Sequence, residues 1–142
     1  MDIETEEKDN LVFLRLFPDE DIYEKLTEAC KKHQLETAVV ISAVGQLKQF
    51  QLGYFKEKGN YTPEKFQDPH ELLSLSGNIS KQAAGYEFHL HAVLGNKKKS
   101  AVGGHLISGR VAVTNEIVLL KTDLKIKRKL EEVTGLKGMF LD

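Results

Sequence analysis

The sequence predicts an α+β fold, built mostly of antiparallel β-sheet with one clear helix near the N-terminus. Two observations predict it. One early segment repeats its apolar residues at helical spacing, and most of the following chain alternates apolar and polar residues or forms short apolar runs. The length of 142 residues and the 41% hydrophobic content fit a single domain, residues 1–142. Within it, the acidic residues 1–9 are expected to be a frayed leader.

The first strand is expected at residues 11–17, which are apolar on both faces of an extended chain. Arg15 interrupts this run. A buried arginine needs an acidic partner or an interface, because an unpaired buried charge is costly. Pro18 ends the strand.

The one helix is expected to begin after Asp21 and to end near Gln34. Asp21 and Glu24 have the spacing of a capping box, with Asp in the usual place of Ser or Thr. The residues that then recur at helical spacing are Ile22, Leu26, Ala29 and His33.

The remaining elements are expected to be strands. Alternation is cleanest at residues 86–94, and the polar turn at 95–100, followed by apolar residues, predicts a hairpin. For residues 124–130 we favour a strand over a helix. The expected strands are residues 38–43, 47–55, 71–77, 86–94, 101 onward, one or two within 111–121, 124–130 and 139–141.

Charge and cysteine content exclude several classes of protein. Lys and Arg number 20 against 21 Asp and Glu, and the net charge of −1 is unlike that of domains that hold nucleic acid by bulk charge. Cys30 is the only cysteine, which excludes a disulfide framework and a cysteine-based zinc site. No segment has the roughly 20 apolar residues of a membrane helix, and the acidic start is unlike a secretory signal. We therefore expect a cytoplasmic protein without membrane contact.

Three of the five histidines lie close together in the predicted hairpin. His89 and His91 leave the same face of their strand, since side chains alternate along a strand. If the hairpin is centred on Lys98, His91 faces His105 and His89 faces Ile107. All three imidazoles then share one face and can bind one metal ion. The alternative is a pair of half-exposed histidines on a sheet face.

The metal expected at these histidines is zinc, although copper, nickel and iron also accept neutral imidazoles. Three protein ligands leave a fourth position for water or substrate. Gly103 and Gly104 place no side chains beside the imidazoles, which leaves room for a ligand or another backbone. Glu71 and Glu116 are the candidate carboxylates at this site, and Glu87 is ranked below them. Such a carboxylate would accept a hydrogen bond from an imidazole N–H or act as a general base.

Two stretches are basic, residues 97–99 and 121–129. The first is expected to be a solvated hairpin tip. The second could be an exposed strand face or a local patch that binds anions. No aromatic residues interleave with either stretch, so stacking on single-stranded bases is not expected.

Together these segments resemble the PPC domain family, named for plant and prokaryote conserved proteins. Arg128 and residues 134–136 fit the family, as do the motifs that stand in its order at residues 11–17, 71–77, 88–93, 103–106 and 114–118. The resemblance implies an α+β fold around an antiparallel sheet, and a homotrimer. For a member with His-x-His and Gly-Gly-His it also implies a metal, commonly zinc, at His89, His91 and His105.

In plant members this domain follows an AT-hook, an Arg-Gly-Arg-Pro segment that grips the DNA minor groove. This sequence has no such segment and is expected to be of the stand-alone prokaryotic type, so tight DNA binding is not expected. Two function classes stay open. One is a homotrimer whose three-histidine metal site could act on a small molecule, and whether it is an enzyme is open. The other is a DNA-associated regulatory or assembly domain with structural histidines.

Overall fold

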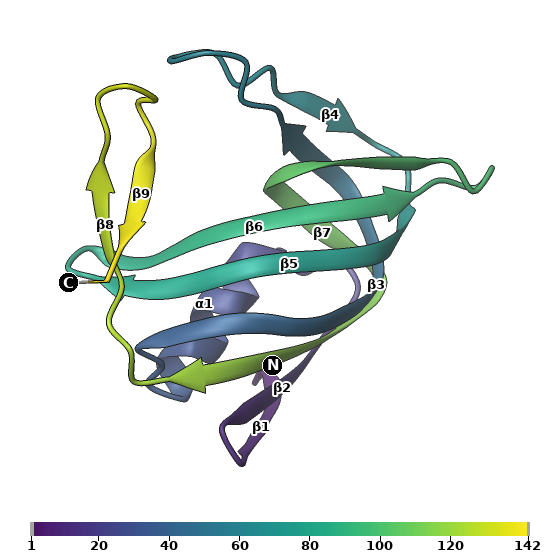
Figure 1. Cartoon of the computed structure of the whole chain (residues 1–142). Coiled ribbons are helices and arrows are strands. Elements are labelled where there is room, and N and C mark those ends of the chain that lie inside the picture. The colour runs from purple at the N-terminus through teal and green to yellow at the C-terminus, as the bar shows by residue number, and fades with distance from the viewer. Residues whose placement is uncertain (1, 142) are drawn as a thin grey trace.

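The part of the chain that the structure describes is mostly strand, with one helix near its start, as the sequence predicts (Figure 1). The computed structural model describes residues 2–141. Within these residues, no helix is long and apolar enough to cross a membrane. The elements are β1 (Glu4–Lys8), β2 (Leu11–Leu16), α1 (Ile22–Lys32), β3 (Thr37–Gly53), β4 (Glu64–Phe66), β5 (His70–Gln82), β6 (Gly85–Gly95), β7 (Ala101–Thr122), β8 (Lys127–Leu130) and β9 (Lys137–Phe140).

The strands form one large antiparallel sheet and a separate hairpin. The order in the large sheet is β1-β2-β7-β6-β5-β3-β4, and β7 also pairs with β3. Each of the strands β7, β6, β5 and β3 therefore pairs with two of the others, so that this part of the sheet closes on itself. The hairpin of β8 and β9 lies near the turn between β5 and β6 (Figure 1). There Gln82 Nε2 donates to the Ile126 carbonyl at 2.8 Å, which ties the hairpin to the sheet.

The core lies between α1 and one face of the curved sheet (Figure 1). Ile22 and Leu26 of the helix are fully buried, and so are Leu90 and Leu94 of β6. Removing these apolar side chains from water is the main stabilising contribution to the fold. Because β6 alternates, Ala92 between these leucines is buried with them, whereas His91 and Val93 face away from the core.

The helix begins where the sequence predicts. Asp21 is its N-cap, and the Asp21 carboxylate accepts from the Glu24 backbone N–H at 3.0 Å. The helix ends at Lys32, two residues before the predicted end at Gln34, with His33 as its C-cap. The ends of a helix are set by caps, so the capping residue located this helix better than its periodicity did.

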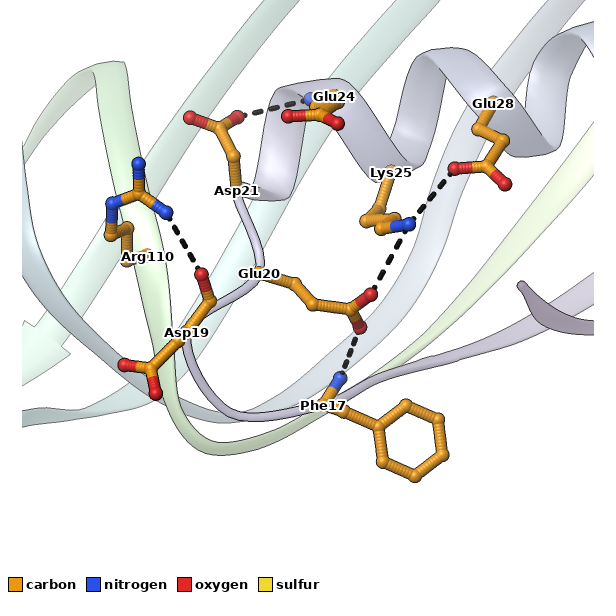
Figure 2. A network of polar contacts seen from close by, with 8 residues as sticks. All are labelled: Phe17, Asp19, Glu20, Asp21, Glu24, Lys25, Glu28 and Arg110. Atoms are coloured by element: carbon orange, nitrogen blue, oxygen red, sulfur yellow. Dashed lines mark hydrogen bonds and ion pairs between the residues drawn. The ribbon is translucent and has the colours of Figure 1, made fainter. Parts of the chain in front are cut away.

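Polar contacts hold the loop between β2 and α1 to the helix α1 and to the strand β7 (Figure 2). The Glu20 carboxylate accepts from the Phe17 backbone N–H at 2.6 Å and pairs with the Lys25 ammonium at 3.2 Å. Arg110 of β7 donates to the Asp19 carbonyl at 2.8 Å. These contacts set the position of the first turn of α1 against β7, the strand that carries one of the three clustered histidines.

The expectation that residues 1–9 form a frayed leader is wrong for residues 4–8. These residues form β1, which pairs with β2 along its whole length. The Glu7 carboxylate lies 3.4 Å from His33 Nδ1 and 2.5 Å from the Lys121 ammonium. The acidic residues are therefore ordered by strand pairing and by basic partners that lie far away in sequence.

The expectation that β2 is buried on both faces is also wrong. Arg15 is exposed, and its guanidinium lies 4.3 Å from the centre of the Phe17 ring. Phe13 is 52% exposed. The helix covers only one face of β2, so the apolar residues of the other face stay in contact with solvent.

Several expected strands are parts of longer ones. Residues 38–43 and 47–55 were expected as two strands, but residues 37–53 form the single strand β3, whose register against β7 shifts at four places. Gly45 bends the strand and does not end it. Its φ is +143°, and a Cβ there would lie 1.9 Å from the Thr114 carbonyl oxygen. Similarly, β7 is one strand throughout, whereas only residues 127–130 of the expected segment 124–130 are strand.

Candidate metal centre

The structure brings His89, His91 and His105 together. One ring nitrogen of each lies within 4.8 Å of those of the other two. The ring centres are 5.2 Å apart for His89 and His91, 5.6 Å for His91 and His105, and 5.9 Å for His89 and His105. Nitrogens that share a tetrahedral zinc are about 3.3 Å apart, given zinc–nitrogen bonds of about 2.0–2.1 Å. Small side-chain rotations therefore bring these three rings onto one ion.

The predicted hairpin register is confirmed at its most important pair, because His91 lies opposite His105. The expected pairing of His89 with Ile107 is wrong. The β6–β7 ladder ends at His91 and His105, and β7 then pairs with β3, whose Gly53 lies opposite His105. Figure 1 shows that β7 bends away from β6 along its length. The histidines therefore lie where β6 and β7 separate.

Gly104 permits the close approach of β3 that separates the strands. A Cβ on Gly104 would lie 2.7 Å from the Gly53 carbonyl oxygen, a distance that real Cβ atoms do not show. The sequence left open whether the glycines make room for a ligand or for another backbone. At Gly104 the neighbour is backbone.

Tyr23 of α1 closes the space between β6 and β7 from the core side. Its hydroxyl donates to the Leu106 carbonyl, and its ring packs edge-on against Phe88 with centres 5.2 Å apart. Burial raises the pKa of Tyr23, so this hydroxyl keeps its proton and remains a donor. The helix thereby supports the strand positions that carry the histidines.

On the outer side, the histidines line a cavity of about 1070 Å³. Its walls come from β6, β7, the loop at residues 54–63 and the β8–β9 hairpin. The hairpin lies against the loop, because a Cβ on Gly135 would lie 3.0 Å from Lys58 Cγ. The cavity is large enough for a small organic molecule.

The environment disfavours the charged form of two of the imidazoles. Burial lowers the pKa of His89, and the nearby His91 and Arg128 lower it further. Burial also lowers the pKa of His105, with further lowering by His91 and His89. The neutral imidazole is the form that binds a metal, so these shifts keep the ligands available at lower pH.

The structure does not bring the candidate carboxylates Glu71 and Glu116 to the histidines. Glu71 lies near the start of β5, where it accepts from Gln46 Nε2 at 3.1 Å. Glu116 lies opposite Arg15 and lines a different pocket. The carboxylate that lines the histidine cavity is Glu87, which had been ranked below them.

Arg128 also belongs to this site, which the sequence did not predict, although Arg128 lies in the basic stretch that could bind anions. Arg128 lines the cavity, and its Nη2 donates to Asn78 Oδ1 at 2.5 Å. Asn78 lies opposite His89 in the β5–β6 ladder. The sequence signals were the basic stretch and the fit of Arg128 to the family, and neither located it at the histidines, because the contact joins segments far apart in the chain.

The sequence profile of the Plants and Prokaryotes Conserved (PCC) domain matches residues 3–123. The chain belongs to this family. The match confirms the resemblance drawn from the order of the short motifs, and the matched residues include all three clustered histidines. The β8–β9 hairpin, with Arg128, lies beyond the matched residues.

Solved structures share the PCC fold over nearly the whole chain. A PPC protein from Pyrococcus horikoshii is 30% identical, with a TM-score of 0.80 over 96% of this chain and 94% of that one. A metal-containing protein from Archaeoglobus fulgidus is 28% identical, with a TM-score of 0.82 over 99% of both chains. A candidate DNA-binding protein from Bacteroides thetaiotaomicron is 24% identical, with a TM-score of 0.90 over 98% and 97%, and this likeness shows the fold alone.

Among curated proteins, the chain is similar to the bifunctional protein GlmU of a Synechococcus strain. The two are 31% identical over 124 residues, which are 86% of this chain and 18% of GlmU. In a second Synechococcus strain the corresponding share of GlmU is 19%. The chain thus spans less than a fifth of the length of these relatives, and the likeness concerns one part of them.

Proposed function

We propose that this PCC-domain protein is a homotrimer that binds a metal ion, zinc by its donor set, through His89, His91 and His105 and presents it to a small molecule. The observation that carries the proposal is the approach of three ring nitrogens to within 4.8 Å of one another at the wall of a cavity. Three imidazole ligands suit zinc and leave one coordination position for water or ligand.

The relative from Archaeoglobus fulgidus supports this proposal. It is described as metal-containing, and its structure matches this chain over 99% of both chains. A zinc ion held by three imidazoles would polarise a bound oxygen or lower the pKa of a bound water. The chain itself contributes the ligands and a cavity whose walls can orient a small molecule.

Zinc binding by the untagged, full-length chain tests the proposal. We expect one zinc per chain near neutral pH, measured by calorimetry and elemental analysis. Burial lowers the pKa of His89 and His105, so these two rings should stay neutral below the ordinary histidine value of 6.5, and zinc affinity should be lost at more acidic pH as they protonate.

Calcium, which prefers oxygen ligands, is the control cation and should not bind. Absence of stoichiometric zinc at neutral pH would contradict the proposal, as would zinc affinity that is unchanged at about pH 4.5. The alternative, a DNA-associated domain with structural histidines, predicts no stoichiometric zinc, so the same titration separates the two functions.

The proposed trimer is supported by an apolar sheet surface that the chain leaves uncovered. Phe13 of β2 and Val44 of β3 line one shallow pocket on the side away from α1, and they are 52% and 53% exposed. Ile41 of β3 is 55% exposed. Contiguous exposed apolar residues of this kind mark protein interfaces. The number of three copies is the one that the family resemblance implies.

Val44→Asp is expected to convert the trimer to a monomer, because it places a charge in the apolar surface that we assign to the interface. Light scattering coupled to size-exclusion chromatography measures the mass directly. Val133→Asp is the matched control. Val133 is 90% exposed in the turn between β8 and β9, and this variant should stay trimeric. A wild-type mass of one chain at micromolar concentration would refute the trimer.

A further inference from the structure

Arg128 is a fixed cation in the wall of the histidine cavity. It lies on β8 and is half-buried. Its Nη2 donates to Asn78 Oδ1 at 2.5 Å, and its Nη1 donates to the Lys137 carbonyl at 3.3 Å. Because Asn78 lies opposite His89 on the neighbouring strand, these two bonds hold the guanidinium beside the histidine cluster.

In the described part of the chain, no ion pair joins Arg128 to a carboxylate. Apart from Arg128 and the histidines, the charged side chains that line the cavity are Glu87 and Lys137, and these pair with each other at 2.9 Å. Both hydrogen-bond partners of the Arg128 guanidinium are neutral oxygens, which orient the group and leave its charge uncompensated. A guanidinium has five N–H donors in a planar fork, so donors remain for an incoming oxyanion.

Another part of the cavity wall is aromatic and apolar. Tyr54, Phe55 and Tyr61 come from the loop between β3 and β4, and the Phe55 and Tyr61 rings have centres 5.8 Å apart. Ile107 of β7 adds an aliphatic side chain. These four side chains are between 37% and 71% exposed, and a bound ligand would remove part of this apolar surface from water.

We propose that the cavity binds a small organic oxyanion, a carboxylate or a phosphate that carries a ring or a similar apolar body. Arg128 binds the charged group, and the aromatic loop covers the apolar body. This inference rests on the proposed metal site, since the charged group would lie between Arg128 and the three histidines. Oxyanions are the ligands that a guanidinium fork recognises best.

Titration of the zinc-loaded, full-length chain with four probes tests the ligand class. The probes are benzoate, phenyl phosphate, benzamide and acetate. We expect benzoate or phenyl phosphate to bind at least about tenfold more tightly than benzamide, which has the ring without the charge. We expect the same advantage over acetate, which has the charge without the ring. The tighter of the two aromatic anions identifies the oxyanion as carboxylate or phosphate.

Arg128→Gln should weaken binding of that anion at least about tenfold, because it removes the charge and most of the donors. Arg128→Lys should be intermediate, since it keeps the charge and loses the fork. The matched control is Lys127→Gln, which removes the same charge from the preceding residue of β8, an exposed side chain that does not line the cavity. This control should bind like the wild type.

Zinc content and thermal unfolding are measured for each variant, because the bonds of Arg128 also hold the hairpin. A folded Arg128→Gln variant that keeps its zinc and loses the anion supports the inference. Equal binding by this variant and the wild type overturns it, and so does equal binding of benzamide and both aromatic anions.

Failure of zinc to bind at all overturns the metal proposal by itself. In that case the same titrations on the zinc-free chain decide the anion site. Arg128-dependent binding of an aromatic anion would support the site, and its absence would overturn it.

Discussion

His91→Ala is expected to weaken zinc binding by more than the roughly 10–100-fold that loss of an outer-shell partner causes. His91 is the central residue of the cluster. Its ring centre is 5.2 Å from that of His89 and 5.6 Å from that of His105, whereas the outer two are 5.9 Å apart. The side chain is exposed, so the fold should tolerate its removal. Calorimetric titration with zinc measures the loss.

The matched control for this variant is His33→Gln. His33 lies outside the cluster, where Nε2 contacts the Thr5 hydroxyl and Nδ1 faces Glu7. This variant loses an imidazole and should keep wild-type zinc affinity and stoichiometry. Wild-type affinity in His91→Ala would remove the three-histidine site from consideration, and so would an equal loss in both variants.

Gly77→Ala is expected to destabilise the fold strongly. Gly77 of β5 has φ +134°, and a Cβ there would lie 1.9 Å from the His89 carbonyl oxygen. The collision is with backbone, which cannot rotate away, so β5 and β6 must separate at the residue that carries a proposed zinc ligand. We therefore expect loss of stability together with weaker zinc binding.

Gly85→Ala separates the steric collision from the backbone strain. Gly85 also has φ +134°, but nothing lies within 4 Å of the position of its Cβ. Gly77→Ala should lower the free energy of unfolding by at least about 2 kcal/mol more than Gly85→Ala does, as measured by urea denaturation. Equal destabilisation of the two variants would mean that the close contact between β5 and β6 at Gly77 relaxes at no cost.

The histidine cluster could be predicted because its three members belong to a single hairpin. Alternation at residues 86–94 sends His89 and His91 to one face, and the polar turn around Lys98 sets the register that places His91 opposite His105. A shift of one residue would have turned His105 to the other face. The prediction failed one pair further along, at His89 and Ile107, where β7 leaves β6 for β3.

The choice of carboxylate could not be made from local pattern. Glu71 and Glu116 lie on strands of the same sheet as the histidines, but one is near the start of β5 and the other is opposite Arg15 on β2. Glu87 lines the cavity because of where the β8–β9 hairpin packs, and its partner Lys137 comes from that hairpin. Arg128 reaches the cavity from the same hairpin.

The sequence by itself determined the fold class, the start of the helix, the family and the three clustered histidines. Each of these depends on residues that are neighbours in the chain or across one short turn, where the periodicity of strand and helix decides which way a side chain faces. Tertiary structure alone decided the ordering of β1, the exposed face of β2 and the walls of the cavity. These features depend on which distant segments pack together, and that packing is set by the fit of the whole chain.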